Sequence, residues 1–254
     1  MGAFAVDFSR ERGGKIVALR RAGVDRNLLF APDAPLALDD GGDTFAVAGW
    51  DEAFPTVAAS AGLPGWGTAW RGFPEQRLVR NGVEHRWTMP GYAFERTLRA
   101  EGDALTAAYR WSNTTEDALP ALWAAHALYP TTGLQDTRLP DAELVAGPQC
   151  ILDELEAHLV RDARGWGIAD FGRNGLSWKF FVPAVGPATL RYADVTLTIE
   201  TDAGWWGVFL NRGRFGEPCV GIEPTTHPTD FAAEAPALGA GETRSVWWRL
   251  RASG

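Results

Sequence analysis

Two short segments of the chain carry side chains suited to proton transfer. In one, the apolar run 219–222 ends in Glu223, and Pro224 follows. Proline has no N–H to donate to a neighbouring strand, so we expect a strand that ends at or near Glu223 and holds its carboxylate rigidly, as acid–base catalysis requires. In the other, His126 is a lone polar side chain in the apolar stretch 120–130. Burial there would tune its pKa towards the working pH.

Both patterns also have a structural interpretation. A glutamate that caps a turn or pairs with an arginine would give the first, and a hydrogen-bonded core histidine would give the second. Spacing alone therefore leaves the two interpretations of each residue open.

The elements that would position these residues have the pattern of short β-strands. The chain is punctuated by 29 Gly and 16 Pro. Val195, Leu197 and Ile199 alternate with polar residues, which places them on one face of a strand. Further strands are expected over three runs: 14–19, 105–113 and 243–251. Many short strands predict an all-β sandwich or barrel, and since no linker or repeat divides residues 1–254, we expect a single domain.

One helix is expected, over residues 151–164. Leu155 and Leu159 belong to a helical apolar stripe. Glu154 lies early in the segment and Arg161 late, as the helix dipole prefers.

Composition and charge exclude several classes of protein. The chain has 24 basic and 32 acidic residues, a net charge of −8, and no Lys/Arg-rich cluster. This argues against a nucleic-acid partner. We find no signal-peptide pattern, and the longest apolar stretch, 118–130, is too short to span a bilayer. We therefore expect a soluble, cytoplasmic protein with no membrane partner. Cys150 and Cys219 are too few for a disulfide framework and are expected to be reduced.

The sequence lacks the common cofactor and nucleophile motifs. It contains no dinucleotide-binding or P-loop glycine pattern and no Gly-x-Ser-x-Gly elbow. Its four histidines show no metal-ligand spacing, so neither a metal nor an organic cofactor is expected. The 12 Trp against 4 Tyr suit stacking on the apolar face of a sugar ring, although filling a core would account for most of them.

Several segments follow one another in an order that is typical of one protein family. They are IVAL (16–19), GWDEAFP (49–55), MPGYAFERTLR (89–99), WAAHALYP (123–130), GIEPTT (221–226) and GAGETRSVWWRL (239–250). Together they resemble the aldose 1-epimerase (galactose mutarotase) family, and the Glu-Pro and closing-strand motifs are the most specific of them.

The resemblance implies a fold and a reaction. The fold is a large antiparallel β-supersandwich. The reaction interconverts the α and β anomers of a free sugar without a cofactor: a glutamate removes the C1 hydroxyl proton while a histidine protonates the ring oxygen. Carried over to this chain, Glu223 would be the base and His126 the acid. The partner would be a small-molecule carbohydrate, and the protein a monomer or homodimer.

The chain departs from the family pattern at one position. Trp66 stands where the family commonly has a second histidine; it cannot titrate, but it could form a sugar platform. The remaining substrate-binding candidates are Arg71, Lys179 and His227, each of which could equally lie on the surface. Two alternatives therefore stay open: a carbohydrate-binding protein of the same fold that has lost catalysis, and another sugar-modifying enzyme on that fold.

Overall fold

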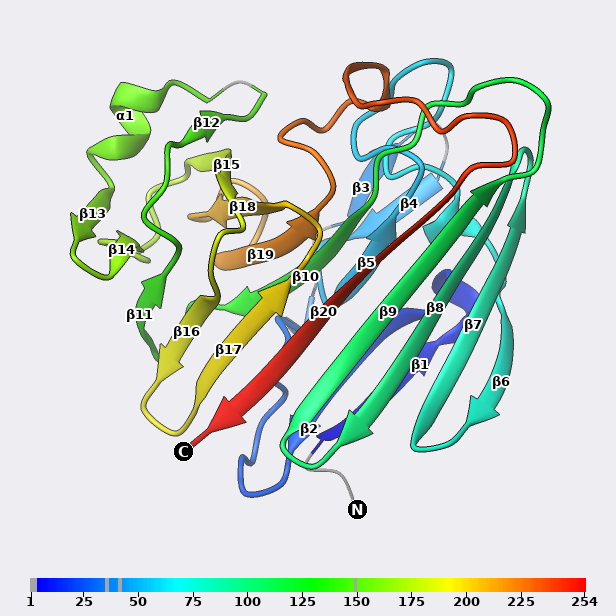
Figure 1. Ribbon diagram of the computed structural model, residues 1–254. Helices are drawn as coiled ribbons and strands as arrows, with labels where there is room; N and C mark the ends of the chain where they lie inside the picture. The colour runs from blue at the N-terminus through cyan, green and yellow to red at the C-terminus, as the bar shows by residue number, and fades with distance from the viewer. Residues whose placement is uncertain (1–3, 35–36, 41–42, 149) are drawn as a thin grey trace.

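Two eight-stranded antiparallel sheets face each other and form the body of the protein (Figure 1). The computed structural model describes residues 4–34, 37–40, 43–148 and 150–254. The first sheet has the order β1–β2–β5–β10–β19–β18–β15–β12. Its strands are β1 Phe4–Ser9, β2 Lys15–Arg21, β5 Trp50–Ala53, β10 Ala124–Pro130, β19 Cys219–Thr225, β18 Trp205–Asn211, β15 Ser177–Pro183 and β12 Val145–Ala146.

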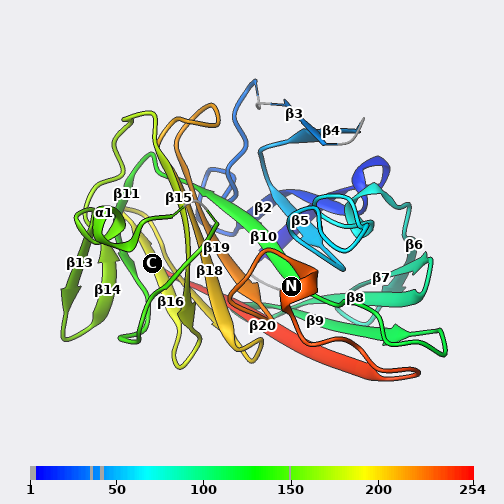
Figure 2. The ribbon, with the colours of Figure 1, turned by 90° about the horizontal axis from the view of Figure 1, so that it is seen from above.

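The second sheet has the order β11–β16–β17–β20–β9–β8–β7–β6. Its strands are β11 Leu134–Arg138, β16 Ala188–Tyr192, β17 Thr196–Thr201, β20 Thr243–Ser253, β9 Ala104–Asn113, β8 Tyr92–Glu101, β7 Gly82–Met89 and β6 Glu75–Val79. Figure 2 shows the two sheets as two layers, seen from above. This architecture confirms the all-β antiparallel sandwich expected from the sequence.

Small elements complete the described chain. Two hairpins form separate two-stranded sheets: β3 Ala37–Asp40 with β4 Asp43–Ala46, and β13 Leu159–Asp162 with β14 Gly165–Ile168. The helices are short: α1 Leu152–Glu156 and the 3₁₀ turns Arg10–Arg12, Ala69–Arg71 and Ala232–Glu234. None of the helices in the described ranges has the length and apolar character that a membrane span needs.

Large side chains fill the space between the sheets. The fully buried aromatic residues include Trp50, Trp111, Trp123, Trp248 and Phe94. A buried ion pair crosses this layer, because Nη1 of Arg96 on β8 lies 2.8 Å from Oε1 of Glu52 on β5. Successive strand residues point to opposite faces. Glu52 therefore faces the core, and its neighbour Asp51 faces away from it.

Four strands expected from sequence periodicity are confirmed, and the expected helix is largely wrong. The runs 14–19, 105–113, 195–199 and 243–251 fall on β2, β9, β17 and β20. Of the helix expected over 151–164, the structure has the short α1, and residues 159–162 form β13 instead. Ile151 has an extended conformation and gives α1 no side-chain cap. Ile151 is 58% exposed and Val160 is 44% exposed. The apolar residues therefore do not share one buried face, which an amphipathic helix needs. Cys150 and Cys219 are free thiols, as expected.

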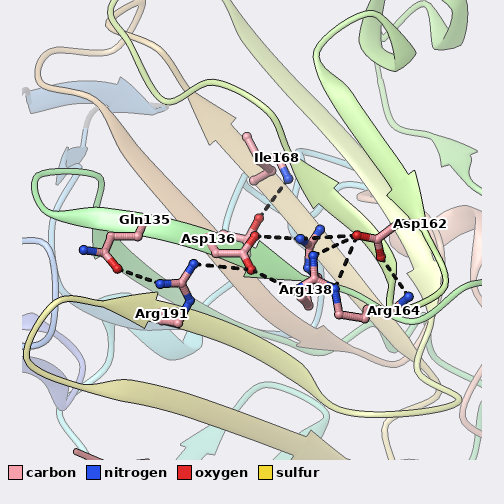
Figure 3. Close-up of polar contacts among 8 residues, drawn as sticks. Gln135, Asp136, Arg138, Asp162, Arg164, Ile168 and Arg191 are labelled. Atoms are coloured by element: carbon pink, nitrogen blue, oxygen red, sulfur yellow. Dashed lines mark hydrogen bonds and ion pairs between the residues drawn. The ribbon is translucent and has the colours of Figure 1, made fainter.

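The hairpin β13–β14 is attached to β11 by a cluster of ion pairs on the surface (Figure 3). Arg138 lies between Asp136, at 3.1 Å, and Asp162, at 3.6 Å. Arg164 pairs with Asp162 at 2.8 Å and approaches Asp136 at 3.8 Å. We call these residues the arginine cluster. Water partly reaches these contacts, and they add to the backbone hydrogen bonds that join β14 to the chain just after β11.

Candidate active site

Strands β10 and β19 bring Glu223 and His126 together. In this antiparallel pair Leu128 lies opposite Gly221. Two positions further along each strand, His126 lies opposite Glu223, and directly opposite residues share a face of the sheet. Nε2 of His126 is 3.3 Å from Oε1 of Glu223. Two residues far apart in the sequence are thus in contact, as the acid–base hypothesis requires.

The strand that carries Glu223 ends two residues beyond it, near the expected place, but Pro224 does not interrupt it. β19 continues to Thr225, and Pro224 pairs with Trp206 of β18. The pairs with β10 occur at Thr225 and again from Gly221, so Pro224 falls in the interval between them. The missing N–H is tolerated in that interval, because no ladder bond has to be made there. Glu223 therefore sits inside a rigid sheet rather than at its edge.

Two glycines make room for the Glu223 carboxylate. Gly221 precedes it by two residues on the same face, and Gly207 lies opposite it on β18. A Cβ added to Gly221 would lie 2.5 Å from Oε1 of Glu223, whereas one on Gly207 would lie 3.5 Å from Oε2. Glycine inside a strand often marks such a close approach. The carboxylate therefore lies flat over the sheet, above Gly221.

Lys179 on β15 supplies a counter-ion for Glu223. Its Nζ contacts Oε2 of Glu223 and lies 3.8 Å from Oδ1 of Asp230. Burial alone would lower the pKa of Lys179, but the attraction of Glu223 and Asp230 outweighs it and raises that pKa. The ammonium therefore remains charged.

A second ion pair lies on the other side of His126. Asp51 on β5 is directly opposite His126, and its Oδ2 is 2.7 Å from Nζ of Lys15 on β2. Both side chains are buried. Five side chains from five strands thus form a row across the outer face of the first sheet. We call it the buried row: Lys15, Asp51, His126, Glu223 and Lys179.

Burial shifts the proton affinities of the two central residues in opposite directions. Desolvation raises the pKa of Glu223 to about 7, although Lys179 opposes the shift. Desolvation, with repulsion from Lys179 and Lys15, lowers the pKa of His126 well below its ordinary value. Each shift favours the neutral form of the group. At pH 7 the carboxyl group of Glu223 is therefore protonated in about half of the molecules, and the imidazole of His126 is neutral.

A hollow of about 220 Å³ opens beside this row. It is lined by Val47, Val57, Trp66, His126, Lys179, Phe209, Phe215 and Asp230. Glu223, which is fully buried, lies beneath His126 and Lys179 rather than in the wall. Among the described residues, no group of three or more His, Cys, Asp or Glu side chains is placed to hold a metal ion.

The structure places two of the four substrate-binding candidates at the hollow and two outside its lining. Lys179 and Trp66 line the hollow, and the ring of Trp66 meets that of His126 edge to face, with centroids 4.2 Å apart. Arg71 is not among the lining residues; its Nη1 donates to the carbonyls of Gly65 and Gly67, at 2.9 and 2.7 Å, and so supports the loop that carries Trp66. His227 is half-buried outside the lining, with Nδ1 3.1 Å from its neighbour's carbonyl.

Sequence reasoning missed three charged members of this region: Lys15, Asp51 and Asp230. A signal existed for Asp51, because the pair Asp51-Glu52 interrupts an otherwise apolar strand pattern. Two adjacent acids in a strand must point to opposite faces, so each needs its own partner. No local signal marks Lys15 or Asp230 as a partner, since both meet the row only through the fold.

Comparison with known proteins finds similarity in structure but not in sequence. No family model matches the chain. No curated protein sequence matches it either. A galactose mutarotase related enzyme from Lactobacillus acidophilus superposes with a TM-score of 0.71 at 11% identity, covering 100% of this chain and 96% of that one. A galactose mutarotase-like protein from Lactobacillus casei gives 0.70 at 14% identity, with 99% and 97% covered.

The same fold also occurs as part of a longer protein that is described by a different domain. A TPR-domain containing protein from Parabacteroides distasonis gives a TM-score of 0.71 at 13% identity, covering 99% of this chain and 46% of that one. Because identities this low establish the fold alone, activity has to be argued from the site. The chain is thus a divergent example of the galactose mutarotase-like fold.

Proposed function

We propose that the protein is an aldose 1-epimerase-like isomerase that interconverts sugar anomers. The observation that carries the proposal is the contact between Glu223 and His126 beside a hollow open to a small molecule. Acid–base catalysis needs two groups of unlike proton affinity within reach of the same substrate. The pair supplies one carboxyl and one imidazole, both held by a rigid sheet.

In the proposed reaction a proton first moves within this pair. When it passes from Glu223 to His126, a carboxylate and an imidazolium form together, and Lys179 stabilises the new negative charge. Glu223 then takes the proton of the C1 hydroxyl, and His126 gives its proton to the ring oxygen. The C1–O5 bond breaks and the open aldehyde turns about C1–C2. Closure on the other face returns both protons to their starting groups.

The test is the rate of anomer exchange, measured by NMR across a panel of free aldoses. Glu223→Gln keeps the shape of the side chain and removes the base, so we expect the rate to fall by about 10²–10⁴-fold. The exposed Glu116→Gln is a matched control and should retain the wild-type rate. Wild type that equals Glu223→Gln on every sugar would refute the proposed activity.

One observation favours a second candidate, a sugar-binding protein without catalysis. Glu223 is fully buried, and Lys179 covers one of its oxygens. A sugar must displace Lys179 or approach past His126 to reach the carboxylate. If neither happens, sugars should change the fluorescence of Trp66 but exchange their anomers at the spontaneous rate.

A further inference from the structure

The wall of the hollow is chemically uneven. Among the described residues that line it, Val47, Val57, Phe209 and Phe215 are hydrocarbon, and Trp66 presents an apolar ring with a single N–H donor. The other three, His126, Lys179 and Asp230, are polar. An ordinary hexose carries hydroxyl groups around most of its ring, so this wall offers few partners to the part of such a sugar that it encloses.

The three polar groups form one patch. Lys179 reaches Glu223 and lies 3.8 Å from Asp230, and His126 is 3.3 Å from Glu223. Aromatic rings border the patch, because the ring centroids of Trp66 and Phe209 lie 4.2 and 6.0 Å from that of His126. A ligand therefore meets polar groups at one place and C–H or π surfaces around it.

This arrangement penalises enclosed hydroxyl groups. A hydroxyl that loses water without gaining a partner costs about 1–3 kcal/mol. A C–H face or methyl group placed on an aromatic ring has no comparable free-energy cost, because it has no hydrogen bond to water to lose. The ligand that fits should present its reacting oxygens to the patch and an unoxygenated surface to the wall.

The charge of the patch argues against a phosphorylated sugar. Lys179 is the one cation among the described lining residues, and two acidic side chains, Glu223 and Asp230, already face it. A phosphate dianion would compete with both for Lys179 and would be repelled by each of them that is ionised. Sites that bind phosphate usually present several free N–H donors or an arginine fork.

Taking the proposed function as given, we infer that the hollow binds an uncharged 6-deoxyaldose in preference to the parent hexose or its 6-phosphate. The reacting ring oxygen must lie at the patch. C6 is attached to the carbon that bears this oxygen, so it lies beside the patch in any productive pose. The rings that line the hollow there are Trp66, Phe209 and Phe215, the last with its centroid 6.1 Å from that of Phe209. Their C–H and π surfaces favour a methyl group over a hydroxymethyl group.

The first experiment compares three sugars that differ only at C6: D-fucose, D-galactose and D-galactose 6-phosphate. Anomer exchange is followed by NMR with the full chain at pH 7. We expect kcat/KM to be about tenfold higher for D-fucose than for D-galactose, since an apolar pocket discriminates against an added hydroxyl only moderately. The phosphate should show the lowest value. A parent hexose or phosphate that equals or exceeds D-fucose overturns the inference.

A binding experiment separates failure of the inference from failure of the proposed function. Glu223→Gln is titrated with the same sugars, and the fluorescence change is used to obtain each Kd. If exchange stays at the spontaneous rate but D-fucose binds most tightly, the proposed activity is wrong and the inferred selectivity stands. Equal binding of all three sugars, or binding of none, overturns the selectivity.

A variant tests whether the apolar wall is the cause. Phe215→Tyr adds one hydroxyl at the wall of the hollow with little change in packing. It should reduce the preference for D-fucose over D-galactose by about threefold, the effect of one modest hydrogen bond. Phe73→Tyr is the matched control, because Phe73 is 70% exposed and does not line the hollow. An unchanged preference in Phe215→Tyr would contradict the assignment.

Discussion

Two carboxylates, each held by a cation, behave in opposite ways in this molecule. Glu223 contacts Lys179 in the buried row, and Asp162 contacts Arg164 in the arginine cluster (Figure 3). The side chain of Glu223 is 1% exposed and that of Asp162 is 43% exposed. Burial raises the pKa of Glu223 to about 7 in spite of its partner, whereas the hydrogen bond from Arg164 lowers the pKa of Asp162.

The difference shows what burial adds to an ion pair. At the surface, water already solvates both charges, so the partner can only favour ionisation slightly. In the row, the free-energy cost of desolvating the Glu223 carboxylate exceeds its stabilisation by Lys179. The carboxyl group therefore holds its proton up to about neutral pH. Asp51 follows the same rule, because burial raises its pKa although Lys15 opposes the shift. The row is therefore costly for stability, and it keeps the pKa of Glu223 near neutral pH, which the proposed proton transfer would use.

The largest expected effect comes from removing the imidazole of the row. His126→Asn keeps a polar side chain but cannot exchange the shared proton with Glu223, so anomer exchange should fall by about 10²–10⁴-fold. His158→Asn is the control, since this histidine lies outside the row, 3.3 Å from Arg212. If both variants keep the wild-type rate, the row is not the catalytic group and its contrast with the surface cluster has no functional meaning.

The next effect tests the counter-ion. Lys179→Met leaves Glu223 without its cation, so the pKa of Glu223 should rise further above 7. In wild type the rate should fall as the pH rises above about 7, because the pair loses its proton; in the variant this fall should move to higher pH. Ionised Glu223 would then be buried with its partner removed, which should cost about 3–5 kcal/mol in the free energy of unfolding.

Urea unfolding at pH 6 and pH 9 tests how the loss of stability in Lys179→Met depends on pH. A pKa raised in the folded state means that stability is lost as the pH rises from the unfolded value towards the folded one. The variant's deficit should thus be larger at pH 9 than at pH 6. Lys179→Arg restores the charge and should recover most of the stability. Equal deficits at both pH values would argue that Lys179 contributes packing rather than charge.

A smaller effect tests the position of the carboxylate. In Gly221→Ala the new Cβ would lie 2.5 Å from Oε1 of Glu223, so the carboxylate must move away from His126. A displacement of this kind should lower the exchange rate by about tenfold. Gly207→Ala, where the nearest approach is 3.4 Å, should be nearly neutral. Similar rates for the two variants would mean that Glu223 does not need its present position.

The sequence predicted the sandwich better than it predicted the site. Alternation in β9, β17 and β20 is local, and one buried face per strand is enough to produce it. The failed helix at 151–164 shows the limit of this local signal. Its apolar spacing suits a helix, but Ile151 and Val160 are exposed, and the buried Leu155 and Leu159 belong to different elements. Tertiary pairing of β13 with β14 overrode the local pattern.

The candidate site likewise contains residues that the sequence suggested and residues that it did not. Glu223 and His126 were proposed together because a family resemblance connected them. Their partners could not be predicted: Lys15 and Asp51 join the row through strand order and register, and Asp230 approaches Lys179 from the loop after β19. Strand order depends on the whole chain, and a one-residue change in register would move each side chain to the other face. The positions of Arg71 and His227 outside the hollow depend on loop paths that no periodicity encodes.

The smallest effect is expected at the surface, where the comparison is most direct. Asp162→Asn and Asp51→Asn make the same chemical change in the arginine cluster and in the buried row. Asp162 is exposed, so its variant should lower Tm by no more than about 2 °C, an effect that 1 M salt should abolish. Asp51→Asn removes a buried charge 2.7 Å from Lys15 and should lower Tm about three times as much, with little response to salt. Equal, salt-sensitive changes would show that water screens both pairs alike, and burial could then not explain why Glu223 keeps its proton.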